Sequence, residues 1–137
     1  MPIARGTFDV SLAPLDPPDD AGDGNRLGRM SIDKQIIGDL QASTRGQMLS
    51  SMSGTPGSAG YVAIERVTGV LAGRSGSFVL QHSGSMDRGA QSLAIHVVPD
   101  SGTGGLVGIT GVFRLAIAGG VHSYELEYAL PIPADAP

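Results

Sequence analysis

The stretch from Tyr61 to Met86 reads YVAIERVTGVLAGRSGSFVLQHSGSM, and it decides the fold. Two runs rich in β-branched and aromatic residues, Tyr61–Leu71 and Ser75–Met86, flank the small, turn-prone Ala72-Gly73-Arg74. Runs of this kind on either side of a short turn are typical of a β-hairpin. The stretch therefore predicts two long antiparallel strands.

The composition extends this prediction to the whole chain. Of the 137 residues, 21 are Gly, while only 3 are Phe, 3 are Tyr and none is Trp. Abundant glycine with few large side chains favours many strands joined by tight turns over packed helices. The length suits one hydrophobic core, so we expect a single domain over residues 1–137.

Six further segments alternate between apolar and polar residues with a period of two, which is the pattern of half-buried strands. They are residues 3–12, 27–38, 39–52, 89–98, 111–118 and 121–130. Together with the central hairpin they predict an all-β, eight-stranded antiparallel barrel, with a two-sheet sandwich as the alternative. Residues 13–28 are expected to form a long acidic loop, and residues 131–137 a short tail that begins where prolines end the last strand.

Charge and residue usage exclude several classes of function. The net charge is −4, and no run of Lys or Arg is present that would neutralise a line of phosphates, so no nucleic-acid partner is expected. The chain has no Cys, and its 3 His lack HxH or HExxH spacing, so we expect neither a metal ion nor another cofactor. Without a signal peptide or an apolar run of about 18 residues, the expectation is a cytoplasmic protein with no membrane partner.

A glycine-rich segment between the sixth and seventh predicted strands reads SGTGGLVGITG over residues 101–111. No βαβ pattern surrounds it, so a tight corner is expected there instead of a dinucleotide site. The Gly-Thr-Gly turn, followed by a hydrophobic residue and further glycines before the penultimate strand, resembles allene oxide cyclases and related dirigent-type barrels. The segments ERVTGVLAGRSGSFVLQHSG (65–84) and VVPDSGTGGLVGITG (97–111) also resemble a small bacterial family of uncharacterised function with that barrel.

This resemblance implies an eight-stranded antiparallel barrel, frequently oligomeric, with an apolar cavity open at one end. The residues support an oligomer independently, because the predicted strand Gly89–Val98 is largely apolar on both faces. A strand of this kind is suited to packing inside the barrel and against another subunit outside it. A homo-oligomer is therefore expected.

Two residues of the hairpin are the candidate catalytic groups. Glu65 shares a face with Tyr61 and Val67, and a carboxyl buried there without a partner has a raised pKa, which is frequent in functional acids. His82 shares a face with Phe78 and Leu80, and its imidazole exchanges protons near pH 7. The alternatives are an ion pair or hydrogen bond inside the barrel for Glu65 and a satisfied core residue for His82.

The hairpin register predicts which side chains lie beside Glu65. A turn centred near Gly73 places Glu65 roughly opposite Gln81 or His82, so that one of them is its cross-strand neighbour. The lumen is further expected to hold a substrate against apolar rings and polar groups of the same strands and of the last strand. These candidate substrate-binding residues are Tyr61, Phe78, Gln81, Tyr124 and Tyr128.

One further polar residue, Lys34, falls on an apolar strand face. Its amine either points inward or extends into water along the strand end, and extension into water is the more frequent behaviour of such a lysine. His96 is expected on the outside or at a subunit contact, and His122 at the rim.

Three functions are compatible with such a barrel. The leading one is a cofactor-free isomerase or cyclase that folds a small hydrophobic molecule into a reactive shape while Glu65, His82 or a tyrosine polarises one oxygen. The others are a noncatalytic carrier or sensor of such a molecule and a structural oligomer with a filled barrel. A catalyst needs Glu65 and its neighbour to face open space, whereas in a carrier these groups can satisfy each other.

Overall fold

The structure is a computed structural model and describes residues 1–132; most of the predicted tail, residues 133–137, lies outside the described residues. Within residues 1–132 no helix is long and apolar enough to cross a membrane. The strands of the described residues are β1 (Ile3–Pro14), β2 (Asp19–Asp20), β3 (Arg26–Gly38), β4 (Leu40–Met52), β5 (Ala59–Leu71), β6 (Arg74–Asp87), β7 (Ala90–Val97), β8 (Thr103–Gly104), β9 (Thr110–Ala118) and β10 (Val121–Ala129).

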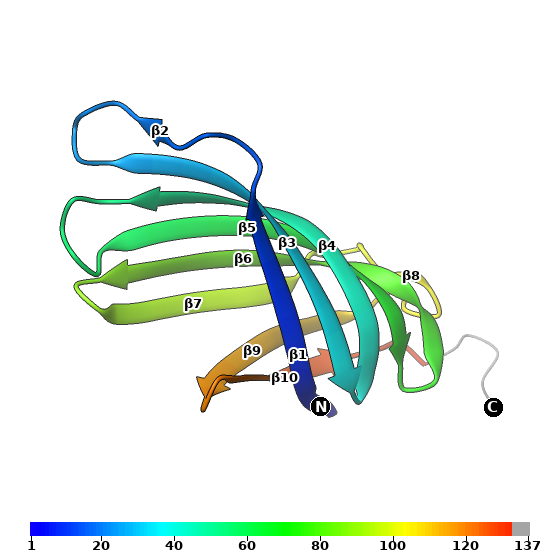
Figure 1. Ribbon diagram of the computed structural model, residues 1–137. Helices are drawn as coiled ribbons and strands as arrows, with labels where there is room; N and C mark the ends of the chain where they lie inside the picture. Colours follow the sequence, from blue (N-terminus) through cyan, green and yellow to red (C-terminus); the bar gives the residue numbers. More distant parts are fainter. Residues whose placement is uncertain (133–137) are drawn as a thin grey trace.

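Eight of these strands form a closed barrel (Figure 1). Hydrogen-bonded neighbours follow the order β1, β10, β9, β7, β6, β5, β4, β3, and β1 also pairs with β3, which closes the circle. All of these pairings are antiparallel. The predicted eight-stranded antiparallel barrel is confirmed, and the alternative of a two-sheet sandwich is not.

The central hairpin forms as predicted, with β5 and β6 paired from Leu71 and Arg74 outward. Its two loop residues, Ala72 and Gly73, have φ angles of 52° and 74°. Positive φ at both positions is the requirement of a type I′ turn, whose twist matches that of the flanking strands. The register pairs Glu65 with Leu80, one or two residues from the predicted partner.

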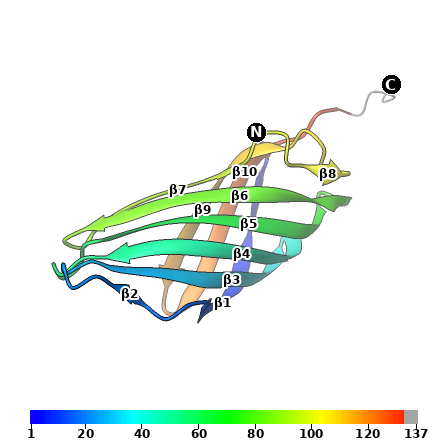
Figure 2. The same cartoon turned by 90° about the horizontal axis from the view of Figure 1, so that it is seen from above.

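The strands fall into two groups that differ in direction. Figure 2 shows β1, β9 and β10 crossing the long strands β3 to β7 steeply. The pairing of β9 with β7 is reduced to the single residue pair His96 and Val112, whereas β1 and β3 share a ladder from Gly6 to Pro14. One end of the long strands therefore extends beyond the closed part of the barrel (Figure 1).

The opposite end of the barrel is filled by the glycine-rich connection between β7 and β9. Its short strand β8 pairs with β6, and the side chains of Leu106 and Ile109 are buried in the hydrophobic core. A Cβ atom on Gly102 would overlap the carbonyl oxygen of Leu106. The segment is thus the tight corner that the sequence predicts, and it closes this end.

The expected loop over residues 13–28 is shorter in the structure. Strand β1 continues to Pro14, which pairs with Met30, and β3 already begins at Arg26. Between them, β2 adds a short pairing to β3, and Asp16 binds Arg29 with its Oδ2 atom 2.7 Å from Nε. Prolines and glycines marked the loop correctly, but cross-strand pairing extends both neighbouring strands into it.

Replacing Gly102 with Ala tests the role of this corner. The added methyl group would overlap a backbone carbonyl that cannot move freely, so we expect the free energy of unfolding to fall by about 1–3 kcal/mol in urea denaturation. Gly60→Ala is the control, because a Cβ there would lie 3.8 Å from the nearest atom, the carbonyl oxygen of Gly84. Equal losses in the two variants would contradict this role.

Candidate functional site

The inward side chains of β3 to β7 lie in rows, because each strand pairs in register with the next. At the open end, one row runs through Ser50, Tyr61, Gly84 and Leu93. The row below it contains Met48, Ala63 and His82, and the next contains Gly46 and Glu65. The barrel is hollow at the outermost of these rows, since all four of its residues line a cavity.

This space is a cavity of about 360 Å³, which we call the mouth. Four of the five methionines of the chain line it together with Tyr61 and Leu93. Methionine is flexible and polarisable, and it adapts to apolar ligands of different outline. The methionines are Met30, Met48, Met52 and Met86.

Below the mouth, the carboxylate of Glu65 is the centre of a buried polar network. Its Oε1 atom lies 3.1 Å from Nζ of Lys34 and 2.8 Å from Nε2 of His82. The hydroxyl of Thr44 donates to Oε2 at 2.7 Å. The four side chains are at most 3 % exposed, so the charges of Glu65 and Lys34 are neutralised by each other within the barrel.

The strands are shaped to hold this network. Gly46 faces Glu65 across β4 and β5, and a Cβ on Gly46 would lie 2.8 Å from the Cα atom of Glu65. The backbone N–H of Lys34 donates to the Thr44 hydroxyl at 2.9 Å, so that hydroxyl accepts one hydrogen bond while it donates another. No buried side-chain nitrogen or oxygen within the described residues lacks a partner.

The surroundings of Glu65 favour its ionised form. Burial raises the pKa of the carboxyl, but the His82 hydrogen bond, the Lys34 charge and the Thr44 hydrogen bond together outweigh it, so the pKa of Glu65 lies below its ordinary value of 4.5. The sequence predicts a raised pKa for a carboxyl that is buried at this position without a partner. The structure supplies three partners, so the pKa of Glu65 is lowered instead.

His82 connects the network to the mouth. Because ionised Glu65 accepts a hydrogen bond from Nε2, a neutral His82 ring has Nδ1 free to accept, and the hydroxyl of Tyr61 lies 3.3 Å from it. Burial, and then the charge of Glu65, raise the pKa of Tyr61 above its ordinary value of 10.0. Tyr61 therefore stays protonated at neutral pH and has its hydroxyl at the floor of the mouth.

On its other side, the network contacts aromatic rings. The Nζ atom of Lys34 lies 5.0 Å from the ring centroid of Phe8 and 5.4 Å from that of Phe113. Both distances are within the range of cation–π attraction. The alternative in which Lys34 extends into water is wrong, because its side chain is 3 % exposed.

The structure places the predicted site residues in three different environments. Glu65, His82 and Tyr61 come together below the mouth. Gln81 does not: it is exposed on the outward face of β6 and pairs with Ile64, so its assignment to the lumen is corrected. The cause is strand parity, since neighbouring residues of a strand point to opposite faces.

The remaining three predicted residues lie in the packed core. Phe78 is fully buried and Tyr128 is 9 % exposed. The Tyr124 hydroxyl accepts from the Leu40 backbone N–H at 3.1 Å and lies 2.9 Å from the Ile37 carbonyl oxygen, so it fastens the turn between β3 and β4. None of the three lines the mouth.

Comparisons with known proteins give a family. The model of a family described as a protein of unknown function, DUF3224, matches residues 4–128. The chain belongs to the DUF3224 family. The DUF3224 chain is also similar to a solved structure, a protein with unknown function from the same family from Shewanella oneidensis MR-1, with 46% identity, a TM-score of 0.91, and coverage of 96% of this chain and 98% of that one.

No curated protein matches this DUF3224 chain. The comparisons support the predicted resemblance to a family of uncharacterised barrels. The finer resemblance to allene oxide cyclases is not confirmed by them. The roles of the predicted site residues in this DUF3224 protein therefore depend on the geometry alone.

Two other expectations concern metal ions and partners. Among residues 1–132, no group of three or more His, Cys, Asp or Glu is arranged to hold a metal ion. On the outward face, Leu49, Val62 and Ile64 of β4 and β5 are each more than half exposed, which is compatible with the predicted homo-oligomer. The oligomer itself stays a prediction.

Glu65→Gln tests the network of this DUF3224 barrel. The substitution removes the charge that neutralises Lys34, and breaking a buried pair in this way costs about 3–5 kcal/mol. Because the folded-state pKa of Glu65 lies below its ordinary value of 4.5, its stabilisation is complete above that pH and is lost as the pH falls through the folded-state pKa. The difference between wild type and Glu65→Gln in urea unfolding should therefore be largest near pH 7 and shrink on acidification.

The double variant Lys34→Met/Glu65→Gln is the control for this experiment. It removes both charges, so we expect a smaller loss of stability than for Glu65→Gln alone. A difference between wild type and Glu65→Gln that does not change with pH would contradict the ionised network.

Proposed function

We propose that this protein binds a small, neutral, hydrophobic molecule in the mouth of its barrel. The observation that carries the proposal is the lining of the mouth, where four methionines, Tyr61 and Leu93 surround about 360 Å³. Pockets of this size with apolar walls and few polar groups are typical of small-molecule sites. Since none of the lining residues is charged, a neutral ligand is favoured over an ion.

The Tyr61 hydroxyl is the proposed polar anchor. It is held by His82 from below, and the ring lies over Gly84, where a Cβ would collide with it. Because the proton of the Tyr61 hydroxyl is directed at Nδ1 of His82, the hydroxyl oxygen is left to accept a hydrogen bond from a hydroxyl group of the ligand. Ser50 of β4 and Ser92 of β7 add uncharged polar groups to the lining.

Binding without catalysis is the form of this proposal that the network favours. Glu65 and His82 are hydrogen-bonded to each other, and Glu65 also binds Lys34 and Thr44. Neither Glu65 nor His82 lines the mouth. This is the arrangement expected for a carrier or sensor. A catalyst would be expected to have such groups exposed to the ligand.

A second candidate, a cofactor-free isomerase or cyclase, is supported by the chain of contacts from Tyr61 through His82 to Glu65. A carboxylate that orients an imidazole, which in turn contacts a hydroxyl, is the arrangement of a proton relay. Tyr61 would then turn its hydroxyl proton from Nδ1 of His82 to an oxygen of the ligand and polarise that oxygen, while the mouth restricts the shape of the ligand. Conversion of one member of a mixture of neutral epoxides and enones, lost in His82→Ala, would favour this candidate over the carrier.

Binding of the neutral fluorescent dye N-phenyl-1-naphthylamine tests the proposed site. Ser50→Trp places a large ring in the mouth, so we expect its dye affinity to fall at least about tenfold, measured by fluorescence titration. Ser43→Trp, exposed on the outward face of the same strand, is the matched control and should bind as the wild type does. Equal affinities of Ser50→Trp and Ser43→Trp would refute the site.

Tyr61→Phe tests the anchor with a ligand that contains an oxygen. Hexan-1-ol is expected to displace the dye from wild type and to do so about five- to tenfold less effectively in Tyr61→Phe, because one hydrogen bond is lost. Affinity for the dye itself should change little. A Tyr61→Phe variant that binds the alcohol as tightly as wild type would show that the hydroxyl is no anchor.

A further inference from the structure

The barrel wall has a wedge-shaped opening between β7 and β9, which we call the slit. The two strands share only the pair His96 and Val112 and then diverge, so the facing edges of residues 90–95 and 113–118 have no ladder between them. In the sheet, β7 follows β6, whereas β9 turns away with β10 (Figure 2). The change of strand direction therefore opens the wall at this place.

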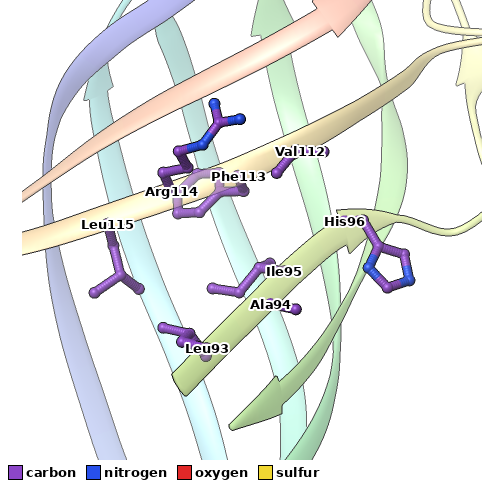
Figure 3. A pocket seen from close by; sticks show the side chains of 8 residues that line it. All are labelled: Leu93, Ala94, Ile95, His96, Val112, Phe113, Arg114 and Leu115. Atoms are coloured by element: carbon purple, nitrogen blue, oxygen red, sulfur yellow. The ribbon is translucent and has the colours of Figure 1, made fainter. Parts of the chain in front are cut away.

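The slit contains a cavity of about 350 Å³. Figure 3 shows Leu93 and Ile95 on β7 and Phe113 and Leu115 on β9. The slit ends at His96 and Val112, where the two strands pair. Arg114 points away from the opening in the same view. Six of the eight residues that line the slit are apolar, so its walls are mainly aliphatic and aromatic, and His96 and Arg114 are the two polar residues.

The slit and the mouth share a lining residue, Leu93. Leu93 pairs with Gly84, and Gly84 pairs with Tyr61, so the residue lies in the same row as the proposed anchor. A Cβ on Gly84 would lie 3.2 Å from Cδ1 of Leu93 and would collide with the Tyr61 ring. The side chains of Tyr61 and Leu93 therefore both lie over Gly84, where the mouth adjoins the slit.

The shape of the slit restricts what it can hold. A peptide strand inserted between β7 and β9 needs about 4.8 Å on each side along its whole length. The slit ends where His96 and Val112 pair directly, so an inserted strand cannot lie along its whole length. A flexible alkyl chain, in contrast, follows a narrowing apolar groove and gains affinity with each methylene that it buries.

We propose that the ligand of this protein is an elongated amphipathic molecule, with a neutral oxygen-bearing end at Tyr61 and an alkyl chain that leaves the mouth past Leu93 and lies in the slit between β7 and β9. The inference rests on the proposed function and adds the class of ligand. It assigns Leu93 and Leu115, which are not buried, to the contact with the chain, while the buried Ile95 and Phe113 form the floor of the slit.

Competition between the dye and two alcohols of different length tests this proposal. In wild type, decan-1-ol should displace the dye at a concentration at least about tenfold lower than hexan-1-ol. Leu115→Trp fills the slit without lining the mouth, so it should remove most of the advantage of decan-1-ol and leave hexan-1-ol unchanged. The matched control is Ile117→Trp, on the same strand and the same face but 62% exposed and outside the slit cavity.

The milder variant Leu115→Phe is measured in parallel, so that the comparison holds if Leu115→Trp does not fold, as judged by circular dichroism. Unchanged preference for decan-1-ol in a folded Leu115 variant would overturn the slit as a chain site while leaving the mouth intact. Equal loss in Leu115→Trp and Ile117→Trp would overturn it as well. If wild type binds neither the dye nor the alcohols, the proposed function fails, and this inference fails with it.

Discussion

The neutralisation of Glu65 by Lys34 inside the barrel is the constraint on which the rest of the structure depends. A carboxylate with no exposure is tolerated only if charges and hydrogen bonds surround it, and Lys34, His82 and Thr44 provide them. The network spans β3 to β6 and thereby divides the lumen. On one side the barrel is packed by Phe78, Leu106 and their neighbours, and on the other it is open.

Much of the fold was predictable from the sequence because the signals are local. The alternation of residues in the last strand, with Tyr124, Leu126 and Tyr128 inward, needs only a period of two, and the structure buries all three. The turn at Ala72 and Gly73 set the approximate hairpin register. That register was sufficient to bring Glu65 near His82, although it was wrong by one or two residues.

The remaining features depend on contacts between strands that are distant in the sequence. Lys34 lies on β3 and Glu65 on β5, so predicting their contact requires the registers of two successive strand pairs. An error of one residue in either register turns the side chain to the other face of the sheet. The same problem explains why Gln81 was placed inward. The methionines of the mouth are far apart in the chain, and the slit arises from the steep crossing of two strand groups, for which the sequence has no local signal.

The methionines of the mouth have a consequence for the search for a natural ligand. Unbranched thioether side chains change rotamer at little cost, so a wall built from them fits many outlines about equally well. Shape complementarity would then discriminate poorly among candidate ligands. Computational docking that ranks ligands by steric fit would give many of them similar ranks. Chemical discrimination has to come from the Tyr61 phenol and the few uncharged polar groups beside it, so the pattern of oxygen atoms in a metabolite is a more useful filter than its shape.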